Sequence, residues 1–184
     1  MKFTDGWLDG VRHIHSPNFN ERPAHAVVDL LVIHNISLPP EQFNNSNIEL
    51  FFQNKLPWDA HPYFSTIQGL EVSSHFLVKR CGEIIQFVSC DKRAWHAGAS
   101  SFCGQENCND FSIGIELEGA DEIEYEVIQY QKLAELTLIL SNKYFKLNWS
   151  RIVGHCDIAP GRKTDPGISF DWNIYKKQMI IVKI

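Results

Sequence analysis

The chain has 184 residues, of which 44% are hydrophobic and 21% are charged, so it has the length of one domain and the composition of a globular protein. Its 17 Lys and Arg against 22 Asp and Glu give a formal charge of −5, which argues against the broad basic face of a nucleic-acid-binding protein. Its longest apolar runs, 30–33 and 179–182, are far shorter than the roughly 20 residues that cross a membrane.

The start of the chain and its cysteines predict a cytoplasmic protein. The first residues lack the apolar stretch of a secretory signal. The five cysteines are odd in number and show no paired framework, which favours reduced thiols. We expect one domain over residues 1–184, with its catalytic motifs within about 27–172, and a monomer.

The first elements in chain order are a strand and a helix. Residues 27–34 are apolar and rich in β-branched side chains, which indicates a buried central strand. Ser46 and Glu49 have the spacing of a capping box, and the helix that they begin is expected to end at Pro57. One stripe of this helix carries Ile48, Phe51, Phe52 and Lys55.

A hairpin, a strand and a long helix follow. Residues 72–78 and 84–88 are strand-like on either side of a short turn, which indicates a β-hairpin. Residues 112–117 alternate between apolar and other side chains, as in a strand with two different faces. Residues 124–144 repeat their apolar positions at helical spacing.

The last third predicts a short strand at 152–154, a polar loop at 155–167 and a final helix capped by Asp171. Because strands and helices are interspersed and one hairpin is clear, we expect an α/β fold. Its single domain should have a mixed central sheet flanked by helices, not an all-parallel doubly wound sheet.

Three residues of the expected strand end and polar loop suit a metal. A catalytic zinc takes three protein ligands and keeps a fourth position open for water. His34, His155 and Asp165 would supply such a set. In the alternative, His34 is a structural side chain and Asp165 caps backbone amides in a solvated turn. Cys156 is a competing ligand, but strand alternation would turn it away from a metal bound by His155.

Two further residues suit amide hydrolysis, which needs a base for water and a positive charge near the oxyanion. Glu116 lies on the same strand face as Gly114, whose missing side chain leaves space, and Lys163 lies on the polar loop. In the alternative interpretation, Glu116 is an ordinary solvent-facing residue of the strand and Lys163 is a solvated surface lysine. Trp95, His96 and Tyr63 could form an aromatic wall for a sugar or peptide, or could serve packing alone.

Four segments, 32–40, 91–98, 108–119 and 154–167, closely resemble those of AmpD-type 1,6-anhydro-N-acetylmuramyl-L-alanine amidases. These are cytosolic members of the zinc-dependent type 2 amidases, whose fold is shared with peptidoglycan recognition proteins. The resemblance implies that His34, His155 and Asp165 bind zinc (Zn²⁺), that Glu116 assists the water and that Lys163 stabilises the oxyanion.

The resemblance also implies a substrate. The reaction would be hydrolysis of the amide between anhydro-N-acetylmuramic acid and L-Ala of a muropeptide, in cell-wall recycling. Asn35, Tyr63, Trp95 and His96 match positions around the substrate groove of the family. Asn107 and Glu71 stand where close relatives carry basic residues, so the preferred third residue of the stem peptide is left open.

Three other functions compete with this one. A non-catalytic peptidoglycan-binding module is disfavoured because such relatives lose a metal ligand. An amidase that acts on intact peptidoglycan, like a lysin, is disfavoured because no signal, wall-binding domain or basic surface is visible. A thiol hydrolase would use Cys156 with a nearby His.

Overall fold

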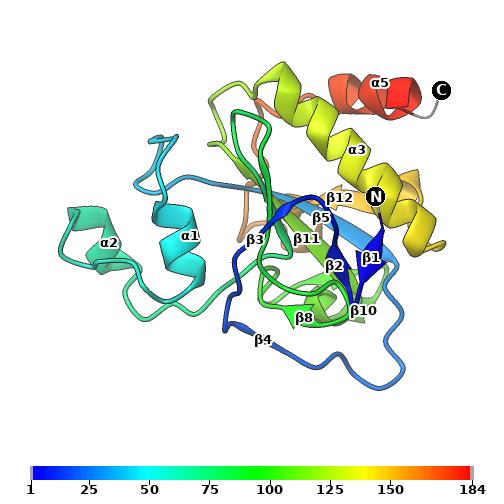
Figure 1. Cartoon of the computed structure of the whole chain (residues 1–184), viewed down its shortest axis with the longest axis horizontal. Helices are drawn as coiled ribbons and strands as arrows, with labels where there is room; N and C mark the ends of the chain where they lie inside the picture. The colour runs from blue at the N-terminus through cyan, green and yellow to red at the C-terminus, as the bar shows by residue number, and fades with distance from the viewer. Residues whose placement is uncertain (1, 183–184) are drawn as a thin grey trace.

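The computed structural model describes residues 2–182, whose centre is a six-stranded sheet (Figure 1). Its strands are β3 (Arg12–His13), β5 (Leu30–Ile36), β6 (Phe76–Val78), β7 (Ile84–Gln86), β11 (Ser112–Glu118) and β12 (Ile152–Gly154). They are ordered β12-β5-β11-β6-β7-β3, and all neighbours are parallel except β6 and β7, which form the expected antiparallel hairpin. The predicted mixed sheet is confirmed.

Short elements surround this sheet. Three two-stranded ribbons pair β1 (Phe3–Thr4) with β2 (Trp7–Leu8), β4 (Phe19–Asn20) with β8 (Arg93–Ala94), and β9 (Ser101–Phe102) with β10 (Gln105–Glu106). Two 3₁₀ turns, η1 (Cys108–Asp110) and η2 (Trp149–Arg151), precede β11 and β12.

Two long helices cover one face of the sheet. α3 (Val127–Lys143) and α5 (Trp172–Val182) pack against each other on that face (Figure 1). The predicted apolar stripe of α3 faces the odd-numbered side chains of the central strands, in a core that contains Leu31, Ile33, Ile113, Ile115, Leu133, Leu136 and Leu140. Asp171 caps α5 as predicted, because its Oδ1 accepts hydrogen bonds from the backbone N–H groups of Asn173 and Ile174.

The opposite face carries the short helices α1 (Asn47–Phe52) and α2 (Pro62–Thr66). Phe51 and Phe52 of α1 are buried there in a second core with Leu77 of β6. Leu77 is the register partner of Glu116, and register partners point to the same face of a sheet. The candidate catalytic carboxylate therefore lies on the face of the sheet that α1 covers in part.

Some local expectations were wrong. Ser46 precedes α1 but makes no side-chain capping hydrogen bond. The helix ends at Phe52 and not at Pro57, and Asn54 then takes a left-handed φ of 58°. The first strand of the hairpin is only Phe76–Val78, and residues 155–158 of the expected loop form a short helix, α4 (His155–Ile158).

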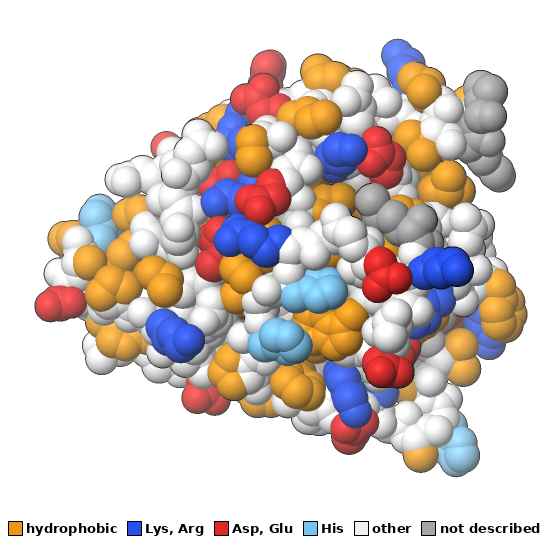
Figure 2. Space-filling view, viewed as in Figure 1, with side chains coloured by type: hydrophobic (Ala, Val, Ile, Leu, Met, Phe, Trp, Pro, Cys, Tyr) orange, Lys and Arg blue, Asp and Glu red, His pale blue; other side chains and the backbone are white. Residues whose placement is uncertain are grey.

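The surface carries charges of both signs. Acidic and basic side chains are interspersed on the face shown in Figure 2. No helix among residues 2–182 has the length and apolar character needed to span a bilayer. The five cysteines are free in this structure.

Candidate metal centre

The register of three parallel strands brings the candidate residues into one row. β5 lies between β11 and β12, with Glu116 opposite His34 and Gly154 opposite Ile33. Because His155 directly follows Gly154, it reaches the level of His34. Carboxyl ends of parallel strands meet at one edge of a sheet, where α/β proteins commonly bind ligands. Residues 34, 116 and 155 are thus brought together by backbone pairing alone.

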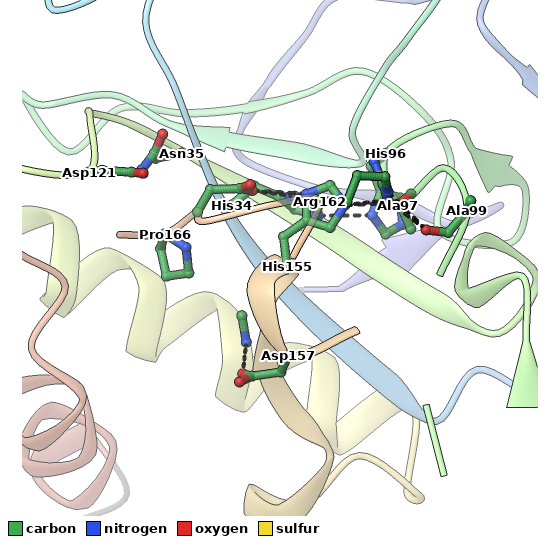
Figure 3. A network of polar contacts seen from close by, with 12 residues as sticks. His34, Asn35, His96, Ala97, Ala99, Asp121, His155, Asp157, Arg162 and Pro166 are labelled. Carbon is green, nitrogen blue, oxygen red and sulfur yellow. Dashed lines mark hydrogen bonds and ion pairs between the residues drawn. The ribbon is translucent and has the colours of Figure 1, made fainter. Parts of the chain in front are cut away.

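The three predicted metal ligands converge. The Nδ1 atoms of His34 and His155 lie 3.0 Å apart, and each lies 3.0 Å from Oδ2 of Asp165. The two histidines are 1% and 3% exposed, and their ring centroids lie 4.4 Å apart in an edge-to-face arrangement. Figure 3 shows both residues within one network of polar contacts. Within residues 2–182, this is the group of His, Cys, Asp or Glu side chains whose ligand atoms approach closely enough to hold a metal ion.

The chemistry of these donors fits zinc. Ligands 2.0–2.2 Å from a tetrahedral zinc are separated by roughly 3.3 Å, close to the observed spacing. The Nε2 atom of His155 lies 3.0 Å from the carbonyl oxygen of Ala97. Because a carbonyl only accepts, a proton on Nε2 is satisfied there, and Nδ1 is then available to bind a metal. The Arg162 guanidinium is farther from Nε2, at 3.4 Å (Figure 3).

Burial and the neighbouring groups set the charge states required of these ligands. Burial lowers the pKa of His34 to about 4, so its ring is neutral near neutral pH. Burial would raise the pKa of Asp165, but contacts with His155 and His34 outweigh it and hold that pKa well below its usual range. Two neutral imidazoles and one carboxylate are the forms that coordinate a metal.

The segment after Asp165 is fixed from several sides. The Asp165 carbonyl accepts a hydrogen bond of 3.0 Å from the Cys156 N–H, and the Pro166 carbonyl accepts one of 2.7 Å from the Tyr125 hydroxyl. Gly167, with φ +83°, lies so close to Asp121 that a Cβ would come within 2.1 Å of the Asp121 Cα. The carboxylate is therefore held by backbone contacts on both sides.

Cys156 lies outside the group of potential ligands, but the argument from strand alternation was wrong. His155 and Cys156 are the first residues of α4, where neighbouring side chains diverge by helical rotation. Burial raises the pKa of the Cys156 thiol, and the Asp157 carboxylate adds to that shift.

Glu116 lies beside the ligands as an almost isolated carboxyl group. It is 8% exposed, and its Oε2 has no hydrogen-bond partner among the described residues. Burial raises its pKa well above the usual value, the charge of Asp165 adds to this rise, and Lys163 opposes it. Lys163 is exposed on the same cleft.

All nine predicted site residues line one cleft of about 590 Å³. They are His34, Asn35, Tyr63, Trp95, His96, Glu116, His155, Lys163 and Asp165. The side-chain amide of Asn35 donates to Asp121 Oδ1 over 2.8 Å (Figure 3), and the Trp95 indole N–H donates to Asn20 Oδ1 over 2.8 Å. Burial lowers the pKa of His96 well below its usual value, so this ring is also neutral.

The cleft has an apolar wall that the sequence reading did not assign to it. Phe51 and Phe52 come from α1, and Ile67, Leu70 and Val72 come from the segment after α2. The helical stripe predicted the burial of the two phenylalanines but not what they face. His61 caps α2, because its Nδ1 accepts a hydrogen bond from the Tyr63 N–H.

The two positions that we expect to differ from close relatives lie in different places. Glu71 is exposed between Leu70 and Val72 of the cleft wall. Asn107, with φ 58°, lies in a separate depression near Ala99 and Ile158.

A buried His-His-Asp group beside an isolated carboxyl group and an exposed lysine defines the class of mononuclear metal hydrolases. Comparison with known proteins narrows this class. The family model for N-acetylmuramoyl-L-alanine amidase matches residues 23–168. The chain belongs to this family, as the sequence motifs predicted.

Two similar proteins are both named 1,6-anhydro-N-acetylmuramyl-L-alanine amidase AmpD. The chain is 52% identical to the protein of Haemophilus influenzae over 170 residues, which cover 92% of each chain. It is 51% identical to the protein of Escherichia coli over 172 residues, which cover 94% of this chain and 93% of the other.

Solved structures of amidases are also similar to this chain. A crystal structure of a selenomethionine AmpD derivative matches with a TM-score of 0.93 and 50% identity, over 97% of this chain and 99% of the other. The amidase AmiD from E. coli, in complex with anhydro-N-acetylmuramic acid-L-Ala-D-γ-Glu-L-Lys, matches with a TM-score of 0.59 and 28% identity, over 88% and 65% of the chains.

Proposed function

We propose that this protein is a zinc-dependent amidase that hydrolyses the amide bond between 1,6-anhydro-N-acetylmuramic acid and L-Ala of muropeptides, in bacterial cell-wall recycling. The observation that carries the proposal is the convergence of His34, His155 and Asp165 beside Glu116 in one cleft. About half of the residues are identical to proteins named for this reaction, and a more distant relative was solved with an anhydromuropeptide.

The cleft suits a substrate that is part sugar and part peptide. Its volume lies within the range of roughly 300–1,000 Å³ that is usual for small-molecule sites. Trp95 and Tyr63 offer aromatic faces for a sugar ring, and the wall from Phe51 to Val72 offers apolar surface. We place the scissile amide at the polar end, where Glu116 and Lys163 meet the ligand group.

His34, His155 and Asp165 would hold the zinc ion. When bound there, zinc supplies a Lewis acid that polarises the amide carbonyl and lowers the pKa of water. Glu116 takes the proton of the attacking water and returns it to the leaving amide nitrogen. Burial suits this role because a carboxylate with a raised pKa is a stronger base.

Lys163 would stabilise the negative charge that develops on the carbonyl oxygen. It lies two residues before Asp165, so its ammonium group can reach a substrate that contacts the ligand group. Its exposure leaves it free to approach the oxyanion.

Three features separate this function from its competitors. The complete ligand group and Glu116 disfavour a module that only binds peptidoglycan. The raised pKa of Cys156 disfavours a thiolate nucleophile. The net charge of −5 favours small soluble fragments over an anionic wall polymer. We propose a cytoplasmic, monomeric enzyme.

The test compares two substrates by mass spectrometry. Zinc-loaded protein is incubated with anhydro-muropeptide or with intact sacculi. Release of free stem peptide from the muropeptide alone is the expected result. Activity should disappear after chelation and return when zinc is added to the dialysed protein. Release of peptide by rigorously metal-free protein, or from sacculi alone, would overturn the proposal.

A further inference from the structure

His96 lies directly on the sheet, behind the metal ligands. Its ring covers Gly114, where an added Cβ would come within 2.5 Å of the ring. Gly114 has no positive φ, so the backbone does not require glycine there. The space that the sequence seemed to leave for a ligand is filled by this imidazole. The missing side chain at position 114 therefore serves the placement of His96.

Hydrogen bonds connect His34 to the backbone through His96. His34 Nε2 lies 2.9 Å from His96 Nδ1, and His96 Nε2 lies 3.1 Å from Ser112 Oγ. The Ser112 hydroxyl in turn donates to the carbonyl of Cys108 over 2.5 Å.

The acceptor at the end of this series of hydrogen bonds determines which atom is the donor in each of them. The Cys108 carbonyl only accepts, so it takes the proton of Ser112, and Ser112 Oγ accepts from His96 Nε2–H. Neutral His96 then has a bare Nδ1, which accepts from His34 Nε2–H. This arrangement leaves the lone pair of His34 Nδ1 free for a metal that is also held by His155 Nδ1 and Asp165. These hydrogen bonds therefore favour the His34 tautomer that can bind a metal, in competition with the Asp165 carboxylate, which would accept a proton from Nδ1.

The same short segment also orients His155. The backbone N–H groups of His96 and Ala97 both donate to Asn109 Oδ1, over 3.1 and 2.8 Å. The Ala97 carbonyl accepts from His155 Nε2, as described above. Asn109 thus holds residues 96 and 97 in place through their backbone N–H groups. The His96 side chain contacts His34 and the Ala97 carbonyl contacts His155, so the two residues favour one tautomer of each histidine ligand (Figure 3).

We propose that His96 is a positioning residue for the metal centre, which acts through His34 with Ser112 as its proton acceptor, and not a substrate contact. This inference rests on the proposed zinc site. Partners of this kind fix the orientation and tautomer of metal-binding histidines, and their loss typically lowers metal affinity 10–100-fold.

The test measures zinc affinity and histidine tautomers without substrate. Zinc competition with a chelator gives the affinity, and ¹⁵N-resolved NMR of imidazole nitrogens in metal-free protein gives the tautomer of His34. We expect a larger share of the Nε2–H tautomer in the parent protein than in His96→Ala, where Nδ1–H can donate to Asp165 instead. His96→Ala should lose about 10–100-fold in zinc affinity, and His96→Asn should recover part of this loss because its amide oxygen can replace Nδ1 as the acceptor.

A double-mutant cycle separates positioning from general damage. Gly114→Ala should weaken zinc binding in the parent protein by displacing His96, and should have little further effect in the His96→Ala background. Ser112→Ala should give mixed His34 tautomers. Ser16→Ala is the matched control, because it removes a buried serine–carbonyl hydrogen bond of 2.5 Å that involves no metal ligand.

Failure of the proposed function and failure of the positioning role of His96 give different results. If the parent protein binds no zinc, the proposed function fails. If it binds zinc, but His96→Ala or Gly114→Ala keeps both the parent affinity and the Nε2–H tautomer of His34, the positioning role is overturned. Circular dichroism of the metal-free variants identifies any that do not fold, and the milder His96→Asn and Ser112→Ala variants then decide.

Discussion

Glu116 shows how one buried side chain gains its chemistry from its surroundings. The strand register puts it opposite His34, and burial leaves one of its oxygens without a hydrogen-bond partner among the described residues. An ionised carboxylate in this position is poorly solvated, which makes it ready to accept a proton. The residue is therefore suited to move protons and has no structural partner that would explain its burial.

Glu116→Gln should lower kcat by about 100-fold or more, because the amide keeps the shape of the side chain but cannot act as a base. Zinc affinity should change little, since Glu116 is not part of the ligand group. Steady-state kinetics and chelator competition check the two expectations. Glu122→Gln, at an exposed position, is the control. Parent-like kcat in Glu116→Gln would mean that another group accepts the proton.

At the residue scale, the sequence was sufficient to name the candidate site residues but not the groups that contact and orient them. Histidines at a strand end and an aspartate on a Pro- and Gly-rich segment are recognisable because metal chemistry demands those side chains. The partners that orient them are not recognisable in this way. Ser112, Asn109 and the Ala97 carbonyl are ordinary groups in the sequence, and only tertiary packing brings them to the histidines.

Among the elements, the segment between α4 and α5 decides where Asp165 lies. It contains two glycines with left-handed φ, Gly161 at +76° and Gly167 at +83°. A Cβ at Gly161 would meet nothing within 4 Å, whereas one at Gly167 would collide with the Asp121 backbone. A substitution at Gly161 therefore introduces backbone strain alone, whereas one at Gly167 introduces both strain and a collision with Asp121.

Gly161→Ala should cost about 1–2 kcal/mol, the strain of an L-residue in this conformation. Gly167→Ala should cost more and should also weaken zinc binding, because relief of the collision moves the segment that carries Asp165. Urea unfolding of metal-free protein and zinc competition measure the two effects. Equal losses in both variants, in stability and in zinc affinity, would contradict a specific role for the contact with Asp121.

Helices and strands were predictable where their buried side chains recur at a constant spacing along the sequence. The alternation at 112–117 and the stripe of α3 follow from faces that meet a core, and both were predicted correctly. Capping at Ser46 and the end of α1 were predicted wrongly. There, a left-handed Asn54 reverses the chain before Pro57 is reached. Such local conformations depend on contacts outside the segment.

For the whole molecule, another buried histidine, His75, links stability to pH. His75 Nδ1 accepts the Gly114 N–H over 3.0 Å, and Nε2 lies 3.1 Å from the Lys92 carbonyl and from the Arg22 guanidinium. Burial and the charge of Arg22 lower the pKa of His75 to about 3. Near neutral pH the ring is therefore uncharged in the folded protein.

The folded protein should lose stability as pH falls from about 6.5 toward 3, because His75 takes up a proton in the unfolded chain but not in the folded one. One such proton contributes a slope of about 1.4 kcal/mol per pH unit. His75→Gln should reduce the slope of unfolding free energy against pH by about this amount. Urea denaturation of metal-free protein at several pH values measures it.

The control for this experiment is His25→Gln, at a solvent-exposed position. It should leave the slope unchanged, whereas His34 and His96 remain in both proteins and contribute equally. A His75→Gln variant with the parent slope would show that His75 does not resist protonation in the folded state.

The spread of the ligand group along the chain has a consequence for biosynthesis. His34 precedes both other ligands by more than a hundred residues, and β12 must pair with β5 before the three can meet. A growing chain therefore cannot hold the metal through all three ligands until Asp165 has been made and β12 has joined the sheet. Chains truncated before Asp165 should compete poorly for intracellular zinc.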